Sequence, residues 1–309
     1  MEFRHVPVLF NETVESLSVR PDGVYADCTA GGGGHSAAIL DRLGPGGRLI
    51  AIDQDPDAIK VLRSRFGGDA RVTVVHDNFR NIGAIGACFA PEGFNGILAD
   101  LGVSSFQLDE PGRGFSYHAD APLDMRMSKV GKSAYDVVNT YPLEELRRIL
   151  RDYGEEKCAG SIAARIVSER EKAPIETTLQ LAEIVKSGIP AKFRREGGHP
   201  AKRSFQAIRI EVNGELALLP GAVEDMFSSL CVGGTLSVIT FHSLEDRIVK
   251  NAFREMTVGC TCPSFFPVCT CGKTPRGELK NRGLGPSEEE LEENPRARSA
   301  RLRSIVRLK

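Results

Sequence analysis

The sequence predicts an α/β fold in which a parallel sheet is interrupted by an inserted helical domain. Three observations support this fold class. Apolar runs alternate with helical patterns over residues 24–100, which is typical of βαβ units. A glycine-rich turn follows the first run, and four runs end in an aspartate. The next apolar run then comes much later than a single crossover requires.

The first predicted strand passes into a glycine-rich turn and a helix start over residues 25–36. Glycine lets the backbone approach a ligand closely, and the amides at a helix start face that ligand. Gly31, Gly33 and Ser36 form a degraded dinucleotide-binding fingerprint, for which a purely structural turn is the alternative. The next apolar run ends at Asp53, 22 residues after Gly31, where an acid can accept both ribose hydroxyls. This spacing favours a nucleoside cofactor.

The other elements of this first segment follow the same alternation. The helical patterns end at glycine-rich stretches, and one begins with a proline in its first turn. The predicted helices span residues 36–43 and 56–66, and the predicted strands span residues 48–53, 72–77 and 96–100.

Four predicted strands end in acids, at Asp27, Asp53, Asp77 and Asp100. Because ligands of open parallel sheets bind at the carboxyl ends of the strands, we expect these acids to line one crevice. Carboxylates attract a cationic cofactor such as the sulfonium of S-adenosylmethionine, whereas they repel the pyrophosphate of NAD. A turn former or helix cap is the alternative role for each acid taken alone.

A long interval separates Asp100 from the next predicted strand, residues 235–241. The interval is 135 residues (235 − 100), and a crossover needs only about 30 to 40. We therefore expect an inserted helical substrate-recognition domain over residues 107–203, between residues 1–106 and 204–309 of the sheet domain. The later helical patterns span residues 142–152, 155–172, 178–186, 204–219 and 222–230, and a last strand spans residues 300–308.

The composition is that of an ordinary soluble globular protein, with 41% hydrophobic and 26% charged residues. The net charge of −1 excludes a global electrostatic attraction to nucleic acid, so contacts with RNA would have to come from local patches. We expect the acidic run 288–293 to be a solvated face or linker. Neither a signal segment nor a run of membrane-spanning length is apparent, so we expect a cytoplasmic protein.

Two groups of residues are candidates for RNA contact. A basic cluster comprises Lys192, Arg194, Arg195, Lys202 and Arg203. A second group mixes cationic and aromatic side chains at Arg113, Phe115, Tyr117 and Arg126. Such mixtures suit phosphate contact and base stacking, although a solvated basic loop is the alternative for the first group.

Eight cysteines are present, and their spacing divides them into two classes. We expect buried thiols at four scattered positions, which are Cys28, Cys88, Cys158 and Cys231. The other four form two closely spaced pairs, Cys260 with Cys262 and Cys269 with Cys271. These pairs could supply four thiolates to a structural zinc, but reduced thiols or a redox pair are alternatives because the spacing is not the usual C-x2-C. No metal ligand is therefore assigned.

A series of longer motifs resembles one known family along nearly the whole chain. The motifs are HVPVL at 5–9, ADCTAGGGGHS at 26–36, AIDQDP at 51–56, LADLGVSSFQLD at 98–109, RGFSY at 113–117, PLDMRM at 122–127, YGEE at 153–156, FQAIRIEVNGEL at 205–216, FHSLEDRIVK at 241–250 and ENPRARSARLR at 293–303. Together they resemble the ribosomal RNA small subunit methyltransferase H family. The resemblance implies a Rossmann-like S-adenosylmethionine-dependent methyltransferase sheet with an inserted helical domain. It also implies methylation of the N4 amino group of a cytosine in the decoding region of 16S rRNA.

Where the motifs match, the resemblance also implies roles for individual residues. It implies that Gly33, Gly34 and His35 hold the methionine end of the cofactor and that Asp53 binds the ribose. The remaining cofactor-binding positions that it implies are Asp77 and Phe79 at the adenine, Asp100 and Gln107. A helix-cap residue is the alternative for His35, and a core aromatic for Phe79.

The chemistry of amino-group methylation explains why an acid belongs at the fourth strand. Cytosine N4 shares its lone pair with the ring, so it needs acceptors for its protons before it can attack. Asp100 is the first candidate, with Ser104 and His242 as additional catalytic partners. The Asp/Asn-Pro-Pro-aromatic turn of many amino-methyltransferases is replaced here by Asp-Leu-Gly-Val-Ser, which leaves the catalytic geometry open.

The expected partner is 16S rRNA within the small ribosomal subunit, with a homodimer as a possible assembly. A methyltransferase acting on DNA or on a small molecule is the alternative function. A third hypothesis is a non-catalytic ribosome-assembly factor that has a cofactor-binding fold.

Overall fold

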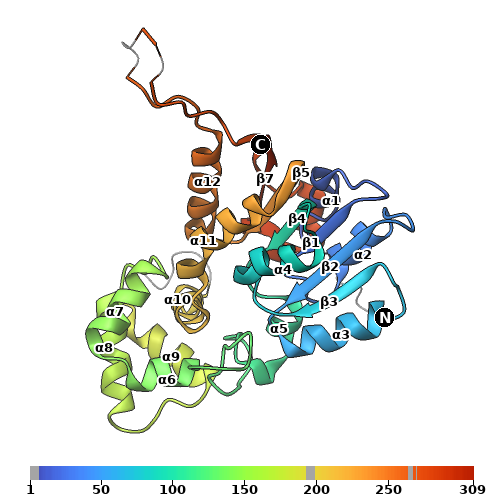
Figure 1. The fold of residues 1–309 in the computed structure, drawn as a ribbon. Coiled ribbons are helices and arrows are strands. Elements are labelled where there is room, and N and C mark those ends of the chain that lie inside the picture. Colours follow the sequence, from blue (N-terminus) through green and yellow to red (C-terminus); the bar gives the residue numbers. More distant parts are fainter. Residues whose placement is uncertain (1–6, 193–198, 264–266, 269) are drawn as a thin grey trace. The chain divides into compact units, whose positions relative to one another are not determined.

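The computed structural model describes residues 7–192, 199–263, 267–268 and 270–309 (Figure 1). Its chain forms two compact units. One unit comprises the residues up to Gly102 together with Ala217–Lys309, and the other comprises Val103–Leu216. The second break comes later than the residue 203 expected from the sequence, because the helix that begins at Lys202 packs into the helical unit through Phe205 and Ile208.

The first unit is built on one seven-stranded sheet. Its strands are β1 (Val24–Asp27), β2 (Arg48–Asp53), β3 (Val72–His76), β4 (Phe94–Asp100), β5 (Leu230–Thr240), β6 (Gly277–Leu284) and β7 (Arg301–Arg307). The order is β3-β2-β1-β4-β5-β7-β6, and the first five strands in this order are parallel. The α/β class expected from the sequence is confirmed. Strand β6 was not expected from the sequence, and together with β7 it adds an antiparallel edge.

The order of the parallel strands reverses between β1 and β4. One half of the sheet continues from β1 to β2 and β3, and the other from β4 to β5. Such a switch point leaves a crevice outside the carboxyl ends of the two central strands. A ligand of this unit is therefore expected next to the segments that follow Asp27 and Asp100.

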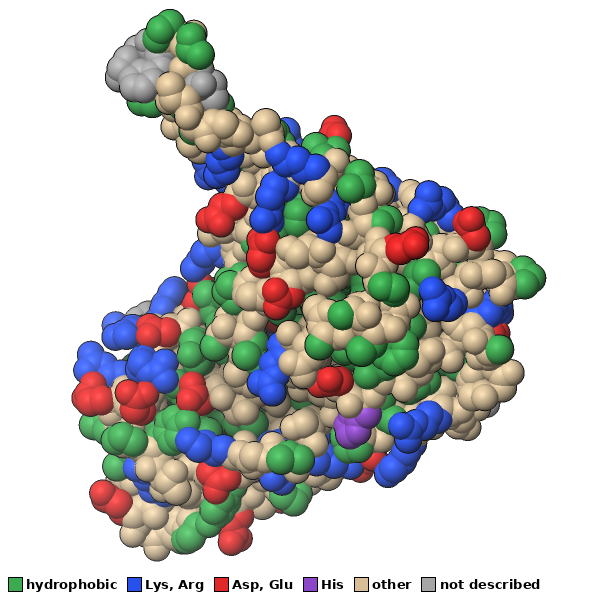
Figure 2. Space-filling view, viewed as in Figure 1, with side chains coloured by type: hydrophobic (Ala, Val, Ile, Leu, Met, Phe, Trp, Pro, Cys, Tyr) green, Lys and Arg blue, Asp and Glu red, His purple; other side chains and the backbone are tan. Residues whose placement is uncertain are grey.

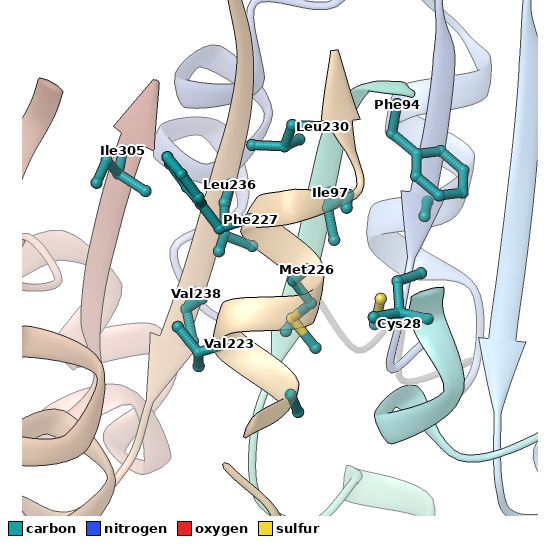
Figure 3. Packing of buried hydrophobic residues seen from close by; sticks show 14 of the residues in the cluster. Cys28, Phe94, Ile97, Val223, Met226, Phe227, Leu230, Leu236, Val238 and Ile305 are labelled. Atoms are coloured by element: carbon teal, nitrogen blue, oxygen red, sulfur yellow. The ribbon is translucent and has the colours of Figure 1, made fainter. Parts of the chain in front are cut away.

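Helices cover both faces of the sheet. The helices of this unit are α1 (Phe10–Leu17), α2 (Gly34–Leu40), α3 (Pro56–Phe66), α4 (Ile82–Phe89), α12 (Ser243–Thr257) and α13 (Glu288–Glu293), and α11 (Glu215–Ser228) lies across its boundary. Side chains of α1, α2 and α3 bury one face of the sheet, where Leu49 and Leu98 point. Side chains of α4, α11 and α12 bury the opposite face, and Figure 3 shows Phe227 of α11 beside Leu236 of β5. Because successive strand residues point to opposite faces, this double burial accounts for the continuous apolar runs in the sequence.

The acidic run 288–293 forms the short helix α13, whose first turn is capped by the Ser287 hydroxyl. None of its residues is buried, so the solvated face fits and the linker does not. Another segment differs from the sequence expectation. Helices were expected over 204–219 and 222–230, but the boundary between the two observed helices lies at Gly214. Its φ of +63° ends α10 (Lys202–Asn213), and α11 begins at the next residue. Pro220 lies inside α11 rather than at a helix boundary.

The second unit is helical, as the sequence predicts. Its helices are α5 (Ser105–Asp109), α6 (Ala134–Thr140), α7 (Leu143–Asp152), α8 (Ala159–Arg170), α9 (Thr178–Gly188) and α10 (Lys202–Asn213). They enclose their own apolar core, which includes the buried residues Leu146, Ile162 and Leu181. A separate core of this size is what allows a segment to fold as a unit.

The cysteines outside the two close pairs differ in burial. Cys28 is buried as expected, whereas Cys158 and Cys231 are only partly buried. Cys88 is exposed on α4, so its expected burial is wrong, because this position lies on the solvent side of the helix.

The molecular surface shows both signs of charge. On the face in Figure 2, Lys and Arg side chains alternate with Asp and Glu side chains, in keeping with the net charge of −1. Among the described helices, none combines the length and apolar character that crossing a bilayer requires.

Candidate cofactor and catalytic site

The glycine turn after β1 adopts a conformation that needs glycine. Gly31 and Gly33 have φ values of +50° and +78°, a region that other residues rarely adopt. A Cβ on Gly33 would lie 2.6 Å from the ring of Phe66. A Cβ on Gly32, in contrast, would meet no described atom within 4 Å, so the turn is open on that side. The turn therefore presents bare backbone at the end of β1.

Asp27 supports this turn from inside the protein and does not line the crevice. It pairs with Ala51 of β2 and Leu98 of β4, which places it two residues behind Asp53 and Asp100 along the strands (53 − 51 and 100 − 98). Its side chain is buried, and it accepts hydrogen bonds from the Ser36 hydroxyl at 2.7 Å and the Thr29 amide at 3.2 Å. Burial raises the pKa of this carboxyl above its usual value. The expectation of four acids lining one crevice is thus wrong for Asp27.

Asp53 ends β2 and is tied to the glycine turn. Its Oδ2 accepts the amide of Gly31 at 2.7 Å, and its Oδ1 accepts the amide of Asp55 at 2.8 Å. Burial raises the pKa of Asp53 to about 6, although the two amide hydrogen bonds oppose this shift. Each carboxylate oxygen can accept more than one hydrogen bond, so Asp53 can bind ribose hydroxyls in addition to the two backbone amides.

Asp77 and Phe79 begin the segment after β3. Oδ1 of Asp77 accepts hydrogen bonds from the Asn78 amide and from Nδ2 of Asn81, both at 2.7 Å. Among the described residues its Oδ2 receives no hydrogen bond, which leaves an acceptor for an exocyclic amine. Phe79 is partly buried against the core of the sheet unit, so only part of its ring is available for stacking.

Asp100 and His35 meet at the switch point. Nε2 of His35 lies 3.6 Å from Oδ2 of Asp100, which is too long for a direct hydrogen bond. Both ring nitrogens of His35 and Oδ1 of Asp100 are buried without a hydrogen-bond partner in the described structure. The Asp100 amide donates to Thr29 Oγ1 at 2.6 Å, and the Phe10 ring stacks on His35 with centroids 5.9 Å apart. Contacts of Thr29 and Phe10 at this site were not expected from the sequence, because no local pattern relates these residues to the strand ends.

These observations fit S-adenosylmethionine. Buried polar atoms without partners are costly, so His35 and Asp100 are expected to contact a polar ligand. The open backbone beside Gly32 admits such a ligand, and Asp53 offers carboxylate oxygens at the adjoining strand end. The negative charge of these acids suits a sulfonium cation.

Ser104 and Gln107 belong to the other compact unit. The Ser104 hydroxyl accepts the Gln107 amide at 3.2 Å, and the Gln107 side chain accepts the Ser104 amide at 3.0 Å. This reciprocal capping box begins α5 and gives both side chains a structural role. A functional role for either residue stays a prediction.

His242 follows β5, the strand that pairs with β4. It is the N-cap of α12: its Nδ1 accepts the amide of Glu245 at 3.4 Å, and its Nε2 lies 3.2 Å from Oε1 of the same residue. Glu245 is buried and also accepts the amide of Phe241. His242 is therefore held in place two residues beyond the end of β5.

The expected RNA-contact residues divide into buried and exposed ones. Arg113 is buried and donates to the carbonyls of Arg126 and Met127, and Phe115 is buried beside it, so direct RNA contact by these two is not supported. Tyr117 stacks on the His199 ring, with centroids 4.4 Å apart.

The remaining candidates for RNA contact lie at the surface. Arg126 is held by Asp124 at 2.6 Å. Lys192, Lys202 and Arg203 are exposed, whereas Arg194 and Arg195 lie outside the described residues.

Comparison with known proteins identifies the family. The model of the MraW methylase family matches residues 2–308. A ribosomal RNA small subunit methyltransferase H of Clostridium botulinum (strain Kyoto / Type A2) is 55% identical over 305 residues, which cover 98% of each chain. The protein of the same name from the strain Loch Maree / Type A3 matches with the same identity and coverage. The chain therefore belongs to the MraW methylase family and is an S-adenosylmethionine-dependent methyltransferase.

Proposed function

We propose that this methyltransferase modifies the N4 amino group of a cytosine in the decoding region of 16S rRNA, within the small ribosomal subunit. The observation that carries the proposal is Asp100, whose Oδ1 is buried and unpartnered at the sheet's switch point. The full-length similarity to relatives named ribosomal RNA small subunit methyltransferase H supports the substrate class.

The proposed role of Asp100 is to accept a hydrogen bond from the substrate amine. The N4 lone pair is delocalised into the cytosine ring, so the nitrogen becomes nucleophilic only as it pyramidalises. A preorganised carboxylate stabilises the positive charge that develops on the nitrogen in this step. The cofactor, when bound, would supply the methyl group of a sulfonium, and the neutral thioether that remains is the leaving group. His242 and Ser104 are proposed as further partners of the amine.

The other site residues are proposed to hold the cofactor. Asp53 accepts the ribose hydroxyls, because its oxygens are oriented by two backbone amides. The remaining assignments place Gly33, Gly34 and His35 at the methionine end, Asp77 and Phe79 at the adenine, and Gln107 as a further cofactor contact.

The helical unit is proposed to recognise the rRNA. Its exposed basic residues Lys192, Lys202 and Arg203 suit phosphate contact. A target within the small subunit implies that the protein acts in the cytoplasm. The proposed assembly is a homodimer, which sedimentation of the purified protein tests.

A transfer assay with isotopically labelled cofactor tests the substrate. Small ribosomal subunits, naked 16S rRNA, DNA and free cytidine are compared as methyl acceptors, and the product is mapped by mass spectrometry of nuclease fragments. We expect N4-methylcytosine in one fragment of 16S rRNA from the subunits. Preferential methylation of DNA or cytidine would refute the proposed substrate. If calorimetry shows cofactor binding but no acceptor is methylated, the result would instead support the hypothesis of a non-catalytic ribosome-assembly factor.

A further inference from the structure

The described residues between α12 and β6 form a projection without a buried core. Its base is closed by the hydrogen bond from the Arg276 amide to the Met256 carbonyl at 2.8 Å. Figure 1 shows this orange segment extending beyond the end of α12, and Figure 2 shows it as a narrow column. None of the described residues from 260 to 276 is buried. Apolar packing therefore does not hold these described residues in one conformation, and a crosslink between side chains would do so.

Three cysteines of the projection come together. The sulfur atoms of Cys260, Cys262 and Cys271 all lie within 4.8 Å of one another. The Sγ atoms of Cys260 and Cys271 are 3.8 Å apart. Two thiolates on a tetrahedral zinc, with Zn–S bonds of about 2.3 Å, are about 3.8 Å apart. A disulfide requires sulfurs at about 2.05 Å, so the observed separation fits a shared metal rather than a covalent pair.

The surrounding groups favour thiolates. The Thr270 amide donates to Cys262 Sγ at 3.4 Å, and the Cys262 amide donates to Cys260 Sγ at the same distance. Amides that donate to sulfur are typical outer partners of metal-bound cysteines, because they stabilise the negative charge.

We propose that Cys260, Cys262 and Cys271 bind a structural Zn²⁺ that holds the projection together. On binding, each thiol releases its proton to solvent and its sulfur donates a lone pair to the metal, without change of oxidation state. Cys269, the remaining cysteine of the two close pairs, lies outside the described part of the chain. The site is separate from the methyl-transfer residues and is independent of the proposed function.

Metal content and cobalt substitution test this site. The full-length protein, purified under reducing conditions, is analysed by elemental mass spectrometry and then reloaded with Co²⁺ after chelation. We expect about one zinc per chain, and cobalt spectra with the ligand-field bands of a tetrahedral site and sulfur-to-metal charge transfer. Cys260→Ser and Cys262→Ser should each weaken zinc binding by roughly 100-fold or more, since each removes a ligand. Cys88→Ser, which changes an exposed cysteine on α4, is the matched control and should keep full zinc content.

Limited proteolysis provides a readout that does not depend on activity. We expect cleavage within residues 258–275 of the zinc-free protein and protection of this segment in the zinc-bound protein, with the sheet unit intact in both. A reduced protein that binds neither Zn²⁺ nor Co²⁺ would overturn the proposal. Iron in place of zinc, or equal zinc content in Cys262→Ser and the wild type, would overturn it as well.

Discussion

Replacing Asp53 with asparagine should weaken S-adenosylmethionine binding and remove most of its dependence on pH between about 5 and 7. Burial raises the pKa of Asp53 to about 6, so the carboxylate is the form that disappears as the pH falls. The ionised fraction drops from about nine tenths at pH 7 to about one tenth at pH 5, and the cofactor affinity should fall by about tenfold over this range.

The size of the loss at pH 7.5 follows from the hydrogen bonds. Both Asp53 oxygens accept backbone amides, from Gly31 and Asp55, so the amide nitrogen of an asparagine must face one of these donors. The ribose also loses a charged acceptor. Together we expect a loss of about 1.5–3 kcal/mol, which is roughly a 10- to 150-fold rise in Kd.

Calorimetric titration with S-adenosylmethionine from pH 5 to 7.5 measures both effects. The matched control is Asp57→Asn, which changes an acid on α3 that pairs with Lys60 at 3.3 Å, and it should keep the wild-type affinity and pH profile. Unchanged affinity of Asp53→Asn at pH 7.5, or a pH slope equal to that of the wild type, would refute the assignment. In the free protein, the raised pKa of Asp53 should make the free energy of unfolding decrease as the pH rises from about 4 to 6, because the folded state holds the proton more tightly.

Three further predictions address the mechanism and the fold. Asp100→Asn should lower kcat by about a hundredfold with a modest change in cofactor Kd, because one acceptor oxygen is replaced by a donor; near-normal turnover would remove Asp100 from the chemistry. Gly33→Ala should lower the free energy of unfolding by about 1–3 kcal/mol and weaken cofactor binding, because a Cβ there meets the Phe66 ring and the φ of +78° is strained. Gly32→Ala is its control for the free energy of unfolding, since a Cβ there meets no described atom within 4 Å. Replacing residues 103–216 by a short linker should preserve cofactor binding in calorimetry and abolish transfer to small subunits, and retained transfer would contradict the recognition role of the helical unit.

Local sequence patterns were sufficient to predict the sheet and its cofactor-binding turn. A buried parallel strand needs a continuous apolar run, and the turn after β1 needs residues that tolerate positive φ, so both leave a local signature. Strands β1 to β5 and the helical unit were therefore recognisable, and Asp53, Asp77 and Asp100 were correctly expected at strand ends. In β6, by contrast, partly buried and exposed residues alternate in a polar stretch, which gives no comparable signal.

Only the tertiary structure decided which segments far apart in the chain contact one another. The register of β1 against its neighbours places Asp27 inside the protein, although its sequence context matches that of Asp53. The stacking of Phe10 on His35 and the gathering of three cysteines in the projection likewise depend on how separate segments meet. Periodicity and composition report which side of a segment is buried, whereas register and contact partners are set by long-range pairing. The sequence by itself therefore determined which kinds of residue form the site, and the fold determined which of them face the ligand.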